Sequence, residues 1–407
     1  MFKLRVVGPR SRDAPYNGSH MEYIGQRAGA ERNAGMNHGL FGEVNGQKCE
    51  KTESIKDMSA YANRMTKSGA IMYKAIISLT EADGIRLGYD KSQKWRELIQ
   101  AKIPDICRKI GLSPSALEYA AAVHLEQNHP HCHILFWDKE QKVKKQPYVH
   151  WKIANDIRID LTKYVFADEM DVIKTAKNMA RNATYKELSD FFTDFIDNFA
   201  NMTAKEYGEA VERLKLNEDF SHGKLIYNRF KAADMREIAQ DFLKLRNNIP
   251  RDGRLDFKFM LPKTKSEIID FIKMILSKNE DCRREYTNYA NAAEELSEFY
   301  SDKPERHAEA RKNAEDDMMK RLGNVVLKAV KNFNKLEQEK DYQHKQDIYK
   351  RQTAENLITE IFSVLSRVCQ TEDNKLSYAS HISELSKQAK KERAIMYENT
   401  SGYDWES

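Results

Sequence analysis

The sequence predicts an α+β protein, in which an antiparallel sheet with helices is followed by a largely α-helical C-terminal region. Up to residue 150, short segments rich in β-forming residues alternate with helical segments. Beyond that point the strand signals nearly vanish, and apolar residues recur at helical spacing. A chain of 407 residues has room for two or three domains. We expect one domain over residues 1–200 and a mostly helical, partly coiled-coil-like region over residues 201–407.

Each element expected in the first part of the chain has a local signal. Ser54 is a predicted helix cap, and Gly111 is a predicted helix end. Pro104 should kink or divide its helix. We expect helices to cover one face of the sheet. The expected elements are a strand over residues 2–6, mostly loop over 8–50, a helix over 54–65, a strand over 72–79 and a helix over 94–110.

The second part of the chain is expected to be helical almost throughout. Its sequence does not decide whether it binds DNA, an accessory protein or another copy of itself. Mixed charge runs such as those of residues 281–350 are usually solvated helix faces, with amphipathic or coiled-coil stripes between them. The expected helices cover residues 151–181, 185–199, 203–216, 232–247, 265–277, 357–368 and 380–396, and the tail 397–407 is expected to fray.

A dense group of histidines marks the segment where we expect the chemistry. Residues 124–133 hold four of the eleven histidines. The segment lies between two short apolar runs, residues 117–123 and 134–137, which predict the two strands of a hairpin. Pro130 stiffens the turn. His129 lies in the turn and is expected to be a rim residue.

Three of these histidines are predicted to converge. Side chains alternate along a strand, so His131 and His133 share one face and Cys132 points to the other. His124, at the end of the partner strand, can reach the same point. Three imidazoles on one face suit a divalent ion with open coordination positions. Glu126 is placed to accept a ring N–H from one of them. Histidines that merely decorate a solvated hairpin are the alternative.

The motif also carries a resemblance. The string Ala122-Val123-His124-Leu125-Glu126, followed by His131-Cys132-His133-Ile134, resembles the metal motif of HUH endonucleases. It is similar to the third motif of the MobP group of conjugative relaxases. Cys132 fills the hydrophobic position between the two histidines. The resemblance implies that the histidine strands are central in the sheet and that the cofactor is Mn²⁺ or Mg²⁺. Gln127 is a departure, because relatives from other mobilisation groups can have a second acid there.

An early segment extends this likeness. Residues 22–33, which begin Glu22-Tyr23-Ile24, and the following His38-Gly39-Leu40-Phe41-Gly42 are similar to MobL-type relaxases. Such enzymes keep a nucleophilic tyrosine near the N-terminus in a Tyr-Ile context, so the resemblance implies Tyr23. His20 and Tyr16 are the alternatives, since some mobilisation relaxases use a histidine. The first nineteen residues look unlike the usual start. The likeness covers roughly residues 20–185.

Two arginines and the charge distribution suit a nucleic-acid substrate. Arg27 and Arg32 lie in a glycine-bearing stretch beside Tyr23, where they are candidates for gripping phosphate. Residues 1–150 have a net charge of +7 and the rest −2, within a total of +5. Phosphate contacts supply most non-specific affinity for DNA. The excess is modest, and it agrees with DNA binding without proving it.

The resemblance implies a function and partners. It implies a relaxase that nicks and rejoins one strand at the transfer origin of a plasmid or integrative conjugative element. The expected intermediate is a covalent 5′-phosphotyrosine. The implied partners are single-stranded origin DNA, accessory relaxosome proteins and a type IV coupling protein.

Three other functions stay open at this point. A rolling-circle replication initiator would use the same histidines, but many carry a second tyrosine or a fused helicase. The sequence has no Gly-x-x-x-x-Gly-Lys-Ser/Thr loop of such a helicase. A small-molecule metalloenzyme would not need the basic first half or the Tyr-Ile segment. The last alternative is a non-nicking DNA-binding or assembly protein.

Cysteine usage and hydropathy bear on the compartment. The five cysteines are scattered and odd in number, which favours reduced intracellular thiols. Residues 1–7 have charges among their apolar residues, so we expect no signal peptide. No eighteen apolar residues run together. We expect a protein of the bacterial cytoplasm with no direct membrane insertion.

Overall fold

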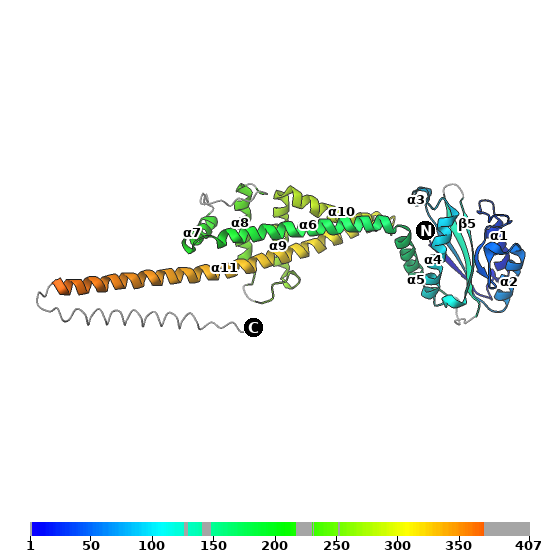
Figure 1. The fold of residues 1–407 in the computed structure, drawn as a ribbon, viewed down its shortest axis with the longest axis horizontal. Coiled ribbons are helices and arrows are strands. Elements are labelled where there is room, and N and C mark those ends of the chain that lie inside the picture. Colours follow the sequence, from blue (N-terminus) through cyan, green and yellow to red (C-terminus); the bar gives the residue numbers. More distant parts are fainter. Residues whose placement is uncertain are drawn as a thin grey trace. The chain divides into compact units, whose positions relative to one another are not determined.

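The structure is a computed structural model that describes residues 2–125, 129–140, 148–216, 230, 232–250 and 253–369 (Figure 1). The strands are β1 (Phe2–Val7), β2 (Phe41–Val44), β3 (Gln47–Lys48), β4 (Met72–Ser78), β5 (Leu117–His124) and β6 (His131–Asp138). The helices are α1 (Asn17–Gln26), α2 (Ile55–Lys67), α3 (Glu81–Arg86), α4 (Ser92–Ile110), α5 (Trp151–Val165), α6 (Ala167–Ala200), α7 (Ala204–Lys215), α8 (Ala232–Asn247), α9 (Pro262–Lys278), α10 (Glu280–Glu298) and α11 (Pro304–Cys369). The predicted α+β class with a largely helical second part is confirmed.

Three predicted features lie outside the described residues. They are the carboxylate of Glu126, the helix over residues 380–396 and the tail 397–407.

The strands form one six-stranded antiparallel sheet in the order β1-β4-β6-β5-β2-β3. The predicted histidine hairpin is therefore confirmed as β5 and β6, and it is central in the sheet. In its register, His124 lies opposite His131, and His133 lies opposite Ala122. Non-adjacent parts of the chain flank the hairpin, with β4 beside β6 and β2 beside β5.

The expectation that helices cover only one face of the sheet is wrong. Helices α4 and α5 pack on one face, and α1 and α2 pack on the other (Figure 1). The reason lies in the central strands, whose alternate residues are apolar on both sides. Along β6, Ile134 and Phe136 are buried in the first core, whereas Leu135 and Trp137 are buried in the second.

Residues 8–50, predicted as mostly loop, contain α1, β2 and β3. Helix α1 carries two glycines that weaken its sequence signal. A Cβ at Gly18 would lie 2.6 Å from the Ser59 carbonyl oxygen, and one at Gly25 would lie 2.8 Å from Leu40 Cγ. Close packing of α1 on its neighbours therefore requires glycine, and this tertiary need outweighs helix propensity.

The short β2–β3 hairpin turns at Asn45 and Gly46, whose φ angles are 52° and 70°. Positive φ at both central residues is typical of a type I′ turn, which Asn-Gly favours. This dipeptide was the signal from which the hairpin could have been predicted.

Several helix boundaries agree with the sequence signals. The Ser54 hydroxyl caps α2 by accepting a hydrogen bond from the Asp57 N–H at 3.3 Å. Gly111 ends α4 in the left-handed region with φ 85°. Helix α4 runs undivided through Pro104.

Helix boundaries in the second part of the chain differ from the predicted ones. The expected helix over residues 151–181 ends at Val165, and α6 then continues for 34 residues, while α11 has 66. No strand follows Asp138 in the part of the chain that the structure describes. No helix of that described part is long and apolar enough to cross a membrane.

The chain divides into two compact units, residues 1–188 with 279–322 and residues 189–278 with 323–407. The second unit has an aromatic core. The ring of Phe195 contacts those of Phe199 and Phe242, with centroids 5.2 Å apart in both pairs. These large rings supply much of the apolar surface that the unit buries.

Candidate functional site

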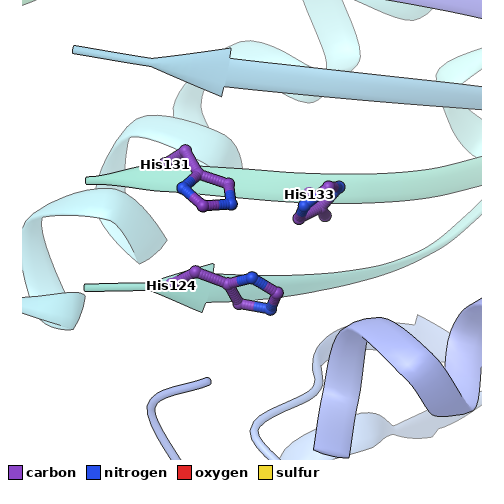
Figure 2. Close-up of side chains that lie close together, drawn as sticks. All are labelled: His124, His131 and His133. Atoms are coloured by element: carbon purple, nitrogen blue, oxygen red, sulfur yellow. The ribbon is translucent and has the colours of Figure 1, made fainter. Parts of the chain in front are cut away.

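Three histidine side chains gather at one end of the β5–β6 hairpin (Figure 2). The ring centroids of His124 and His133 lie 4.9 Å apart, and each lies 5.0 Å from the ring of His131. Candidate ligand nitrogens of all three lie within 4.8 Å of one another. Cys132 is buried on the opposite face, as strand alternation predicts. We call these three side chains the histidine triad.

Backbone carbonyls orient two of the rings. His124 Nε2 donates to the Ile24 carbonyl oxygen at 2.7 Å, and His131 Nδ1 donates to the His129 carbonyl oxygen at 2.7 Å. A carbonyl only accepts, so in the neutral form of each ring the lone pair is on the other nitrogen, where a metal can bind. Glu126, the predicted acceptor for a ring N–H, lies outside the described residues.

The donor set fits a divalent cation. Burial, together with the neighbouring charges of His124 and His131, lowers the pKa of His133 to about 3. His133 is therefore a neutral imidazole at neutral pH. The candidate nitrogens lie within 4.8 Å of one another, so ring rotations can bring them to the shorter spacing that one ion with metal–nitrogen bonds of about 2.1 Å requires. Three neutral ligands leave a bound ion most of its charge.

Helix α1 carries two of the nucleophile candidates, His20 and Tyr23, and His20 lies against the triad. The ring of His20 meets the ring of His133 edge-on, with centroids 6.3 Å apart. Tyr23 is one turn further along the helix, is 54% exposed, and precedes Ile24, whose carbonyl holds His124. Tyr16 is 63% exposed at the start of α1 and makes no contact with the triad among the described interactions.

The chain that follows α1 is fixed to the end of β5. The Glu31 N–H donates to the Val123 carbonyl oxygen at 2.9 Å, and Ala30 forms an isolated β-bridge with His124. This pairing explains how an early segment reaches histidines a hundred residues later. The structure does not bring Arg32 into contact with the triad, and its side chain is exposed.

Arg27, in contrast, lies close to Tyr23 and acts on His133 of the triad. Its guanidinium carbon is 5.7 Å from the centre of the Tyr23 ring, and its charge is among the causes that lower the pKa of His133. An arginine here can reach a phosphate held between the triad and Tyr23.

A family comparison agrees with this geometry. A family model described as MobL relaxases matches residues 13–375. The matched span includes α1, the triad and all the helices up to α11. The chain belongs to the MobL relaxase family. No curated protein and no solved structure gives a significant match. The predicted resemblance is confirmed, and it extends well beyond residues 20–185. A MobL relaxase acts in conjugation, so the predicted role as a conjugative relaxase is also confirmed.

Sequence reasoning missed two cations near the site of this MobL relaxase. Burial, together with the positive charges of Lys74 and Arg5, lowers the pKa of His20 to about 4. Lys74 lies on β4, which is next to β6, and Arg5 lies on β1 at the edge of the sheet. A lysine between apolar residues of the strand over residues 72–79 was the available signal, because lysine seldom lies inside a sheet without a reason.

Proposed function

We propose that this MobL relaxase nicks and rejoins one DNA strand at a transfer origin, with Tyr23 as nucleophile. His124, His131 and His133 would hold Mn²⁺ or Mg²⁺. The observation that best supports the proposal is the hydrogen bond from His124 to the carbonyl of Ile24, the residue after Tyr23. It ties the helix that carries the phenol to the triad.

The reaction is an in-line transesterification. The Tyr23 oxygen bonds to the scissile phosphorus and the bond from phosphorus to the 3′ oxygen breaks. The phenol loses its proton and the departing 3′ oxygen gains one, which leaves a 5′-phosphotyrosine and a free 3′-hydroxyl. A phenol with a pKa of about 10 is a weak nucleophile until a nearby group helps to remove its proton. A bound divalent ion supplies Lewis-acid stabilisation of the phosphate charge. The ester stores the energy for rejoining.

Other groups of the chain have supporting roles in this proposal. Arg27 would hold a non-bridging phosphate oxygen beside Tyr23. Arg32 would contact the strand further away, and Glu126 would orient a triad ring. The substrate would be single-stranded origin DNA, with accessory relaxosome proteins and a type IV coupling protein as partners. Cys49, Cys107, Cys132 and Cys282 are buried free thiols, which agrees with a cytoplasmic site of action.

The test is incubation of the full chain with labelled single-stranded oligonucleotides that span candidate origins, with Mn²⁺ and with EDTA. We expect a metal-dependent covalent adduct that Tyr23→Phe abolishes and Tyr16→Phe retains. An adduct that survives Tyr23→Phe would move the nucleophile to His20 or Tyr16. No adduct on any origin strand would favour the second candidate function, a DNA-binding or assembly protein that does not nick.

A further inference from the structure

The sheet face that carries the triad continues across β4 and β1 towards the sheet edge. Met72, on β4, is buried in the core under α1 and α2. Alternation along the strand therefore puts Lys74 and Ile76 on the same side. Unlike Met72, both are partly exposed, which shows that the helices cover this part of the face incompletely.

The strand register brings basic residues into line with the triad. Ile76 lies between His133 on β6 and Lys3 on β1, and Lys74 lies opposite Arg5. Lys74 is two residues along β4 from the position opposite His133, which puts the two Cα atoms about 8 Å apart. Lysine and arginine side chains at this spacing can reach neighbouring phosphates of an extended strand.

Lys74 has an unusual environment. It is half-buried, and burial, followed by the charge of Arg5, lowers its pKa. Among the described residues no carboxylate forms an ion pair with Lys74, whereas Arg5 pairs with Asp13. A partly desolvated ammonium group attracts an anion more strongly than a solvated one does. No contact within the described chain uses this attraction.

We propose that Lys74, followed by Lys3 and Arg5, binds consecutive backbone phosphates of the single strand as it crosses β4 and β1 next to the triad. That this strand carries the scissile phosphate rests on the proposed function. The binding surface itself does not, because it needs neither the metal nor the nucleophile. Phosphate contacts of this kind position the strand without reading its sequence.

The test measures the salt dependence of binding to fluorescein-labelled oligothymidylate in EDTA, where no strand is cut. Each phosphate contact on single-stranded DNA contributes a slope of about −0.7 to the plot of log K against log salt concentration. We expect Lys74→Met to make the slope shallower by about 0.7, which is about a fivefold loss of affinity at 0.1 M salt. Methionine preserves the apolar packing of the lysine stem.

Matched variants give the control. Lys48 is an exposed lysine on β3, at the opposite edge of the same sheet. We expect Lys48→Met and Lys74→Arg to keep the wild-type slope, and thermal unfolding to show that all variants fold. An unchanged slope in Lys74→Met would overturn the proposal, and so would an equal loss in Lys48→Met. Failure of nicking with the Lys74 effect intact would instead overturn only the proposed function.

Discussion

On one face of the β5–β6 hairpin, Val123, Cys132 and Ile134 are buried beneath α4 and α5. On the other face, the same strands present His124, His131 and His133 beside α1. The first face is apolar except where Asp138 ends β6. The second face is apolar at Leu135 and Trp137 beneath α1 and α2, holds the buried Glu118 at that end, and carries the triad at the other end. The comparison teaches that one face stabilises the hairpin, so that the other can keep three imidazoles together.

The largest expected effect is on the polar face. His131→Ala removes one ring of the triad, and we expect nicking to fall by about 10²–10³-fold, as for other lost groups that stabilise transition-state charge. The initial nicking rate on an origin strand measures it. His129→Ala is the matched control, because His129 is exposed and contacts the triad only through its carbonyl. Equal rates in wild type and His131→Ala would remove the reason for distinguishing the faces.

The next effect belongs to the apolar face. Ile134 is 1% exposed, and Ile134→Ala should lower the free energy of unfolding by about 2–5 kcal/mol, because it leaves a cavity. Denaturant unfolding measures this change. Ile134→Val should cost only about 0.5–1.5 kcal/mol. We expect the nicking rate per folded molecule to stay at the wild-type value in both, and a large loss of rate in folded Ile134→Val would contradict this division.

The smallest effect sharpens the comparison within the polar face, at its covered end. The buried Glu118 carboxylate accepts hydrogen bonds from Trp137 Nε1 and the Asn45 N–H, both at 3.0 Å, and from the Tyr61 hydroxyl at 3.3 Å. Glu118→Gln turns one acceptor into a donor, so we expect a loss of about 1–3 kcal/mol in the free energy of unfolding. Nicking should persist. A catalytic defect without a stability defect would show that the covered end also takes part in the reaction.

The hairpin and its triad could be predicted because their signals are local. Alternation along β6 decides which side His131 and His133 share, and only six residues separate His124 from His131 in the sequence. Helix α1 could not be predicted in the same way. Gly18 and Gly25 lower its helix signal, and the contacts that require them come from Ser59 and Leu40, far along the chain.

The second helical layer and the basic residues Lys3, Arg5 and Lys74 were missed for a related reason. Apolar residues on both sides of β6 indicate two cores, but they do not say which helices fill them. The importance of Lys74 depends on its position beside His133, and that follows from the β4–β6 register. Register between strands far apart in the chain is a tertiary property.

The central claim is that Tyr23 and the triad act on one phosphate. The most direct measurement is mass spectrometry of the covalent adduct that forms on an origin strand with Mn²⁺, after proteolysis and nuclease digestion. We expect the nucleotide mass on Tyr23, in an adduct that does not form in His131→Ala. A nucleotide on any other residue, or an adduct that forms equally well without the triad, would contradict the account.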